Sequence, residues 1–256
     1  MSVKDCYTLN KDISIHYLES TDYSPDLTPL VYVPGALGFA EHFENEMRIL
    51  SPRHCLSLSL RGNGKSDAPL EGYSLEDHVS DIEAVINESH LKGYCLMAYS
   101  MGVPYAIKHA SNSPKHIKGI IICDYPAKYP SIPESWVDTV LSKGFMKEDR
   151  RHVVRGIQRD SKEVGLWEDL QRIKCPVLVI KGGTNNSLLK ENATEKYINY
   201  LSNVNVVEFS DSGHELWKPD YNRFIKTVTE FLEELDQLQR KLNLKGRVID
   251  ESSHSK

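Results

Sequence analysis

Short apolar runs alternate along the chain with amphipathic stretches. The runs at residues 29–33 (PLVYV), 117–123 (IKGIIIC) and 176–181 (PVLVIK) are nearly continuous in apolar residues, as expected of strands covered on both faces. Strands that alternate with helices in this way form a mostly parallel sheet, so the pattern predicts an α/β fold. We expect an antiparallel edge strand at residues 6–10 and further strands at 13–18, 29–33, 54–60, 93–98, 117–123, 176–181 and 204–209.

Helical spacing of apolar residues marks the segments between these strands. In one of them, Val79, Ile82 and Ile86 recur on a single helical face. Ser74, followed three residues later by Asp77, resembles a capping pattern at the start of that helix. The predicted helices cover residues 40–50, 74–90, 101–112 and 219–243.

One segment interrupts the alternation. Residues 126–170 form an insertion that is rich in basic residues and too long for a plain crossover between two strands. We therefore expect a small helical cap over the C-terminal edge of the sheet, where such insertions often carry function. The expected organisation is a core of residues 1–125 and 171–243, a cap of residues 126–170 and a polar tail of residues 244–256.

Composition narrows the classes of function. The 256 residues are 40% hydrophobic and 26% charged, with a formal net charge of −5, which fits one sizeable globular core and gives no basic footprint for nucleic acid. No apolar stretch approaches the roughly 20 residues that cross a bilayer, and the first residues lack the apolar core of a signal peptide. The expected setting is the cytoplasm, with a small-molecule substrate and neither a membrane nor a nucleic acid as partner; no oligomeric state is indicated.

The five cysteines are an odd count, and four of them lie in or beside apolar runs. Buried, reduced thiols in a cytoplasmic protein explain this usage. Because no CxxC or Cys/His metal spacing occurs, we expect neither a metal nor another cofactor.

The most informative motif is AYSMG, residues 98–102. Ser100 follows a predicted strand and precedes a predicted helix, with the small residues Ala98 and Gly102 two positions away on either side. This is the spacing of a nucleophile elbow with Ala in place of the first Gly, a sharp turn in which bulky neighbours would clash and the serine hydroxyl points outward. A serine and small residues can also meet by chance between a strand and a helix, so the motif needs support from elsewhere.

That support follows in sequence order. Gly35, in VYVPGALG, lets the backbone turn so that an amide, that of Ala36, can face Ser100, and with the amide of Met101 it would form an oxyanion hole. A Pro-Gly turn alone is common. His214, in SGHE, comes just after the last predicted strand and is the candidate general base, although a lone histidine is usually structural or solvated.

Taken together and in this order, PGALG, LRGNGKSD, AYSMG, CPVLVIKGG and SGHE resemble the α/β-hydrolase fold superfamily, in the form with a short cap after the sixth strand. The resemblance extends from about residue 13 to about residue 235. It implies a mostly parallel sheet of about eight strands with flanking helices, Ser100 at its centre and His214 reaching across to it. It also implies that CPVLVI precedes the loop that usually holds the acid of a catalytic triad.

That loop has no acid. Asn185 or Asn186 occupies the expected position, depending on whether Gly182 or Gly183 starts the pattern. An amide can orient a histidine but cannot stabilise the imidazolium, and in a serine protease the exchange costs about 10⁴ in turnover. The sequence therefore indicates either an impaired enzyme, with Asn185 or Asn186 orienting a Ser–His dyad, or an acid that comes from elsewhere.

Asp124 is the candidate for a relocated acid. It ends the strand at 117–123, which should neighbour the strand of Ser100, at the sheet edge where active sites form. The order Ser100, Asp124, His214 also keeps the Ser–Asp–His order of this fold. The alternative is that Asp124 only caps its loop; Asp211, three residues before His214, is a poorer candidate because the loop between them is so tight.

The cap offers one indication about substrate. Arg151, Arg155 and Arg159 belong to a run of mixed charge that is most simply a solvated helix face. The functional alternative is that one of them binds a substrate carboxylate.

The expected function is that of a serine hydrolase, which cleaves an ester, lactone or related acyl bond of a small molecule through an acyl-enzyme. Because a fold does not fix a function, three alternatives stay open: a lyase, a cofactor-free oxygenase and a ligand-binding receptor.

Overall fold

An eight-stranded sheet forms the centre of the molecule in the computed structural model, which describes residues 2–253, with side chains described as far as residue 242. The strand order is β1-β2-β4-β3-β5-β6-β9-β10; β2 is antiparallel to both of its neighbours, and all other adjacent pairs are parallel. The predicted strands all form, within three residues at each end. Their bounds are β1 Val3–Asn10, β2 Ile13–Ser20, β3 Leu30–Val33, β4 Cys55–Leu58, β5 Tyr94–Tyr99, β6 Ile117–Cys123, β9 Val177–Gly182 and β10 Val204–Phe209.

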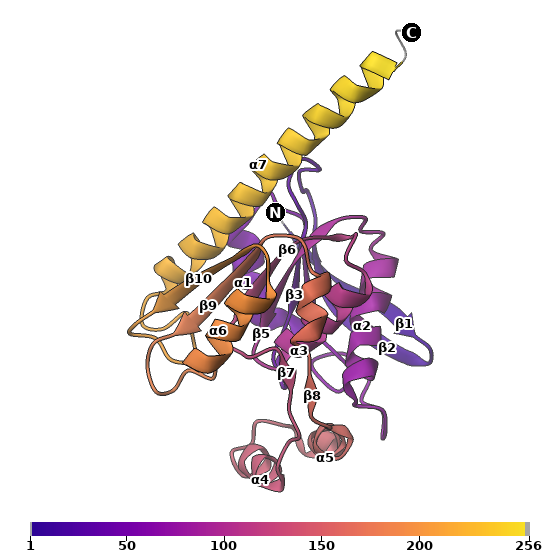
Figure 1. Cartoon of the computed structure of the whole chain (residues 1–256). Helices are drawn as coiled ribbons and strands as arrows, with labels where there is room; N and C mark the ends of the chain where they lie inside the picture. The colour runs from indigo at the N-terminus through magenta and orange to yellow at the C-terminus, as the bar shows by residue number, and fades with distance from the viewer. Residues whose placement is uncertain (1, 254–256) are drawn as a thin grey trace.

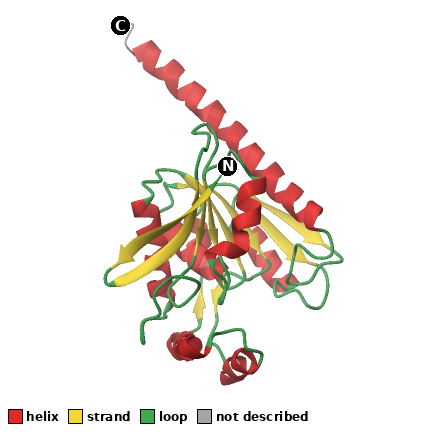
Figure 2. Ribbon diagram, turned by 180° about the vertical axis from the view of Figure 1, so that it is seen from behind, coloured by secondary structure: helices red, strands yellow, loops and turns green. Residues whose placement is uncertain are grey.

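Helices cover both faces of the sheet, as Figures 1 and 2 show. The α-helices are α1 Glu44–Ile49, α2 Leu75–Glu88, α3 Gly102–Asn112, α4 Glu134–Ser142, α5 Arg151–Asp160, α6 Glu191–Tyr200 and α7 Tyr221–Ser253, and the short 3-10 helices are η1 Ala40–Phe43, η2 Glu148–Arg150 and η3 Glu168–Arg172. The predicted α/β fold with a mostly parallel sheet is thus confirmed.

The alternation of side chains along the central strands explains the two layers. In β5, Leu96 and Ala98 join the core cluster that includes α2, α3 and α6, whereas Cys95 and Met97 join the cluster that includes α1 and α7. Residues of this strand are buried on both faces, which is why its sequence reads as continuously apolar rather than alternating.

α2 begins at a capping box formed by side chains near its N-terminus. The Ser74 side chain accepts a hydrogen bond from the amide of Asp77, and the Asp77 carboxylate accepts one from the amide of Ser74, forming the predicted capping box of α2. The predicted helix at 40–50 is instead divided into η1 and α1.

The insertion at 126–170 holds α4, η2, α5 and a short antiparallel pair, β7 (Lys128–Tyr129) with β8 (Val164–Gly165). In Figure 1, α4 and α5 lie beyond the edge of the sheet and are joined to it through β7 and β8. The two helices pack on each other through a small cluster of their own, Val137, Val140 and Val154. Arg150 anchors this unit to the core by donating hydrogen bonds to the carbonyls of Gly62 and Ser66.

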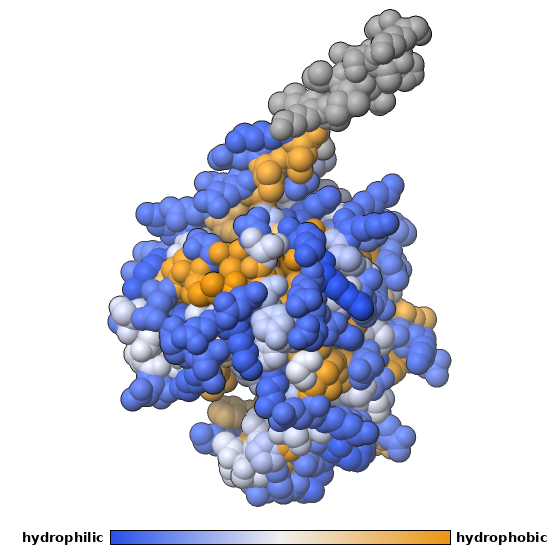
Figure 3. Space-filling model, viewed as in Figure 1, coloured by the Kyte–Doolittle hydropathy of each residue, from blue (hydrophilic) through white to orange (hydrophobic). Residues whose placement is uncertain are grey.

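The last helix is longer than predicted. α7 continues to Ser253, so the expected polar tail from residue 244 is helical in backbone as far as Ser253, and residues 254–256 lie outside the described residues. Figure 3 shows apolar side chains on this helix above the body of the molecule, and Leu238 and Leu242 are among its exposed residues. Across the described residues, no helix combines the length and apolar character needed to cross a membrane.

Candidate active site

The turn between β5 and α3 brings Ser100 to the C-terminal edge of the sheet. Ser100 has φ +54°, an uncommon conformation for a residue other than glycine and the strained one expected of an elbow. Gly102 permits the turn, because a Cβ there would lie 2.5 Å from the carbonyl oxygens of both Val33 and Pro34. The glycine in AYSMG is therefore required by close backbone approach.

A continuous chain of hydrogen bonds links Ser100, His214 and Asp124. The Ser100 Oγ lies 2.9 Å from His214 Nε2, and His214 Nδ1 lies 2.9 Å from a carboxylate oxygen of Asp124. The ring of Tyr99 stacks on the imidazole at 4.7 Å between centroids, which restricts the orientation of His214. The structure thus brings together the three residues that the sequence indicated, from β5, β6 and the loop after β10.

Asp124 is fully buried and holds an ionised carboxylate by hydrogen bonding. Burial alone would raise the pKa of Asp124, but donors from His214, Ser187 and the amides of Gly182 and Leu188 lower it below the ordinary value. The Ser187 hydroxyl lies 2.5 Å from Oδ1, and the Gly182 and Leu188 amides lie 3.0 Å and 2.9 Å from the carboxylate. Asp124 itself has φ +51°, so its backbone turns sharply where β6 ends.

The asparagine loop supports Asp124 rather than His214. Asn185 and Asn186 are exposed, and neither side chain is hydrogen-bonded to His214, whose Nδ1 is occupied by Asp124. Asp211 is exposed and forms an ion pair with Arg223 at 2.5 Å. Of the possible orienting groups named from the sequence, only Asp124 contacts the histidine in the described part of the chain.

Ser187 and the two amides were missed by the sequence analysis. Nothing in the loop sequence GGTNNSLL, residues 182–189, distinguishes Ser187 from its neighbours. Ser187 could have been found only by combining the position of the acid with the strand order. Once the acid is placed at the end of β6, the loop after the adjacent strand β9 is the segment that can supply its hydrogen-bond donors.

The amides of Ala36 and Met101 are the predicted donors of an oxyanion hole. Gly35 lies close to Ser100, since a Cβ on Gly35 would be 3.1 Å from the Ser100 Cβ. Within residues 2–253, neither the amide of Ala36 nor that of Met101 donates a hydrogen bond to another protein group. Both donors are thus available to an oxyanion on a substrate bound at Ser100.

A cavity of about 960 Å³ opens at Ser100 and His214. Its outer wall includes Trp136 and Val140 of α4, and its inner wall runs along the sheet beneath α1 and α7. The lining is mainly aromatic and aliphatic, as in most small-molecule sites.

The cap arginines do not reach this cavity. Arg151, Arg155 and Arg159 lie on the exposed side of α5, where Arg151 pairs with Glu148 and Arg159 with Asp160, whereas α4 provides the cavity wall. The geometry matches the solvated helix face rather than a carboxylate-binding role, because Val153, Val154 and Ile157 turn the other side of α5 to the core.

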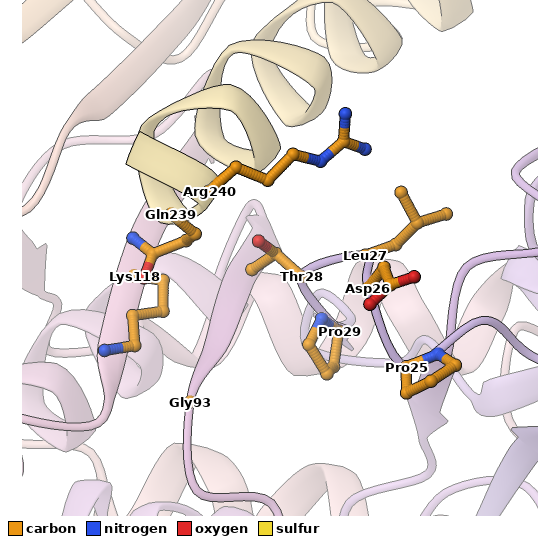
Figure 4. A pocket seen from close by; sticks show the side chains of 9 residues that line it. All are labelled: Pro25, Asp26, Leu27, Thr28, Pro29, Gly93, Lys118, Gln239 and Arg240. Atoms are coloured by element: carbon orange, nitrogen blue, oxygen red, sulfur yellow. The ribbon is translucent and has the colours of Figure 1, made fainter. Parts of the chain in front are cut away.

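Two other features lie outside this site. Asp5, His16 and Glu41 bring ligand atoms within 4.8 Å of one another, but the ammonium group of Lys65 already pairs with both carboxylates. A smaller hollow of about 430 Å³ lies where β5 and β6 begin, at the opposite end of the strands from Ser100. Figure 4 shows Lys118 and Arg240 beside it, with no serine, cysteine or histidine among its labelled residues.

Comparison with known proteins identifies the family of this fold. Residues 28–153 match the family described as alpha/beta hydrolase fold. The AB hydrolase superfamily protein YisY of Bacillus subtilis (strain 168) is 34% identical over 246 residues, which cover 79% of this chain and 91% of that protein.

Solved structures share the fold at low sequence identity. The esterase RhEst1 from Rhodococcus sp. ECU1013 superposes with a TM-score of 0.74 at 19% identity, covering 92% of this chain and 100% of the esterase. A haloalkane dehalogenase, DbeA from Bradyrhizobium elkani USDA94, gives a TM-score of 0.73 at 16% identity, covering 93% and 99%. With the sheet order, the elbow and the relationship to YisY in agreement, the chain belongs to the α/β-hydrolase superfamily.

Proposed function

We propose that this protein is a serine hydrolase that cleaves an ester-type bond of a small molecule through a Ser100–His214–Asp124 triad. The observation that carries the proposal is the pair of 2.9 Å contacts from Ser100 to His214 and from His214 to Asp124. Nucleophile and base are within hydrogen-bond reach, and the base is oriented by a buried third group, which is the arrangement that activates a serine.

The mechanism follows from the positions of these groups. Ser100 Oγ attacks the substrate carbonyl carbon while His214 Nε2 takes its proton, and the amides of Ala36 and Met101 stabilise the oxyanion. Collapse of the tetrahedral intermediate expels the alcohol, which receives the proton from His214. Water, deprotonated by the same histidine, then attacks the acyl-enzyme, and the acid leaves as Ser100 is reprotonated.

Asp124 has a distinct role in these steps. Its carboxylate accepts the Nδ1 proton of His214, which fixes the tautomer with Nε2 facing Ser100 and stabilises the imidazolium that forms. The hydrogen bonds that lower the pKa of Asp124 keep it ionised at neutral pH. The absence of an acid in the Asn185–Asn186 loop is then no obstacle to turnover.

Ester-type chemistry suits this nucleophile better than the dehalogenation named for one structural neighbour. Displacement of a halide by Ser100 would leave an alkyl ether on the serine, which a histidine-activated water does not cleave. An acyl group on Ser100, by contrast, forms an ester that the same water can hydrolyse.

The test is hydrolysis of short p-nitrophenyl esters by the wild type and three variants. Ser100→Ala should remove Ser100-dependent turnover, and Asp124→Asn should lower kcat by about 10⁴, as the matching change does in a serine protease. Asn185→Ala, in the loop beside Asp124, is the matched control and should stay within about twofold, a size expected of an exposed side chain that makes no contact with the site. Circular dichroism would verify that each variant is folded.

Other outcomes point to the alternatives. Equal activity of wild type and Asp124→Asn would show that Asp124 is structural. If no ester is turned over faster by the wild type than by Ser100→Ala, the serine hydrolase proposal fails, and lyase, oxygenase and receptor functions become the next candidates.

A further inference from the structure

The inner part of the cavity forms a chamber between the sheet and two helices. Its floor consists of residues from three adjacent strands, Tyr32 of β3, Met97 of β5 and the last residue of β6, Cys123. Glu46 of α1 and Tyr221 of α7, which are hydrogen-bonded to each other, also line the chamber. The chamber is continuous with Ser100 and is therefore part of the space that a substrate can fill.

Glu46 is the unusual group in this wall. One carboxylate oxygen accepts a hydrogen bond from the Tyr221 hydroxyl at 2.7 Å, while the other is shielded from solvent and has no partner among the described residues. No described Lys, Arg or His lies within ion-pair distance of this carboxylate. A shielded carboxylate oxygen without a partner is costly. Glu46, which is partly buried, differs in this from the buried acids Asp81 and Asp236, which pair with arginines, and Asp124, which pairs with His214.

The chamber lacks positive charge. Among the described residues that line the cavity there is no Lys or Arg, and burial lowers the pKa of the one additional histidine, His42, which keeps that ring neutral at pH 7. The second lining carboxylate, Glu215, is 52% exposed and pairs with Lys218. Glu46 is thus the uncompensated charge that a ligand in the chamber would meet.

Aromatic rings line the same cavity as Glu46. Tyr32 stacks on Phe43 at 4.1 Å, and Trp217 packs edge-on to Phe224 at 6.2 Å, all four lining the same cavity. The faces of such rings attract cations, most of all quaternary ammonium groups, which lose little hydration on entry. Rings and a carboxylate in one chamber are complementary to a cation and unfavourable for an anion.

A purely structural role for Glu46 accounts for less of this arrangement. The bond to Tyr221 joins α1 to α7, but an uncharged glutamine could accept it equally well. The ionised side chain therefore needs a further explanation. Its terminal torsion is soft, so the carboxylate can turn toward an entering group without a change of rotamer.

We infer that the inner chamber binds an alkylammonium group of the substrate, with Glu46 as its counterion, so that the substrates are esters with a cationic substituent on the acyl or the alcohol side. The inference rests on the proposed hydrolase function and deepens it by naming the substrate class. It differs from the role considered for the cap arginines, which would have selected acidic esters.

The kinetic test compares charged esters with uncharged analogues of the same shape. The first pair is the p-nitrophenyl ester of γ-trimethylammonio-butyric acid and the analogue in which tert-butyl replaces the trimethylammonium group. The second pair, acetylcholine and its tert-butyl analogue, places the charge on the alcohol side. Each kcat/KM is first divided by the rate of alkaline hydrolysis of the same ester, which removes differences in intrinsic reactivity. The corrected wild-type kcat/KM should then favour the charged member of at least one pair by about tenfold, a size typical of a desolvated cation–π contact with an ion pair.

Two glutamine variants make the test specific. Glu46→Gln removes the charge but keeps an acceptor for Tyr221, and it should bring the ratio of kcat/KM for the charged and uncharged esters to about one. Glu215→Gln removes an equal charge from the rim and should retain the preference. Two results would overturn the inference while the hydrolase function stands. One is a ratio of charged to uncharged kcat/KM near one in the wild type for both pairs, and the other is a ratio in Glu46→Gln equal to that of the wild type.

A binding measurement tests the ammonium site independently of the proposed hydrolase function. Butyltrimethylammonium chloride, titrated into the wild type against sodium chloride at equal ionic strength, should change the fluorescence of the cavity tryptophans Trp136 and Trp217 saturably. The response should be lost in Glu46→Gln and kept in Glu215→Gln. If no ester is hydrolysed, the function fails, and this titration still decides whether the chamber binds ammonium: an identical response in wild type and Glu46→Gln would refute it.

Discussion

At the scale of single residues, the position of Asp124 at the end of β6 determines which groups must stabilise its charge. A carboxylate at the end of β6 is fully buried beside the nucleophile's own strand, so it needs donors to stay ionised. The loop after β9, which has no acid, provides them through Ser187 and two amides. In this protein the loop after β9 therefore supplies hydrogen-bond donors to the carboxylate instead of the carboxylate itself.

Ser187→Ala tests this support. Loss of the 2.5 Å hydrogen bond to Asp124 should raise the pKa of the carboxyl, because that bond stabilises the ionised form. Bonds to charged groups contribute about 1.5–3 kcal/mol, so kcat/KM should fall by roughly 10- to 100-fold. The acid limb of the kcat/KM profile, which reports proton uptake by the His214–Asp124 pair, should move to higher pH.

The pH profile distinguishes positioning from a general loss of folding. Asn185→Ala, two residues away and exposed, is the control and should reproduce the wild-type profile. A Ser187→Ala enzyme that loses activity equally at all pH values, without a shift of the acid limb, would contradict the assigned role.

The residues of the site were not equally predictable from the sequence. Ser100, His214 and Asp124 were named because each follows a strand at one edge of a parallel sheet, a position that the hydrophobic pattern reveals. Ser187 and Glu46 could not be named. Each acts through a partner distant in the chain, Asp124 and Tyr221, and neither stands out locally from other polar residues.

At the scale of secondary-structure elements, α3 and β5 are joined by a buried polar contact. Tyr94 Oη lies 2.6 Å from Nε2 of His109, and the histidine side chain is almost fully buried. Burial lowers the pKa of His109 to about 4, and the charge of His116 adds to this; Glu83, with one oxygen 3.9 Å from Nδ1 but 42% exposed, does not offset it. The ring is thus neutral in the folded protein at pH 7 and accepts the tyrosine proton.

This contact predicts a loss of stability in mild acid. The unfolded chain binds a proton at His109 near pH 6.5, whereas the folded chain does so only near pH 4, so stability is complete above 6.5 and falls as the pH decreases to about 4. The loss should be at most about 3 kcal/mol. Urea unfolding at about pH 7 and about pH 4.5 would measure it, as the difference between wild type and His109→Gln.

The glutamine at position 109 does not titrate, so this variant should lose part of the wild-type slope. His90→Gln, which alters an exposed histidine at the end of α2, should keep it. Identical slopes for wild type and His109→Gln would mean that His109 takes up its proton equally in the folded and unfolded chains.

The elements themselves were predictable where they are buried. Strands β3, β6 and β9 were found because their apolar runs are nearly continuous, and the other strands of the main sheet were found from shorter runs that mix apolar and polar residues. α6 was missed, since only Thr194 and Tyr197 of its residues are buried and its sequence is otherwise polar. β7 and β8 have two residues each, too few for any periodic signal.

At the scale of the whole molecule, one buried ion pair connects the first and last parts of the chain. Arg53 Nη2 lies 2.7 Å from Asp236 of α7, with side chains only 5% and 4% exposed. The Thr28 amide donates to Asp236 at 2.7 Å, and the Thr28 carbonyl accepts from Arg53 at 2.6 Å. The buried guanidinium and carboxylate are thus hydrogen-bonded to each other and to the backbone of Thr28. These bonds attach α7 to the segment that leads into β3.

Removal of one member should therefore be far more damaging than removal of both. Asp236→Ala leaves the Arg53 guanidinium buried without its counterion and should lower the free energy of unfolding by about 3–5 kcal/mol. Arg53→Met with Asp236→Ala should cost less than the sum of the single changes, because no buried charge remains. Glu230→Ala breaks an exposed pair with Lys226 on the same helix and should change stability by less than about 1 kcal/mol. Urea unfolding of the four variants measures these differences, and an Asp236→Ala protein as stable as Glu230→Ala would show that the pair does not hold α7 to the core.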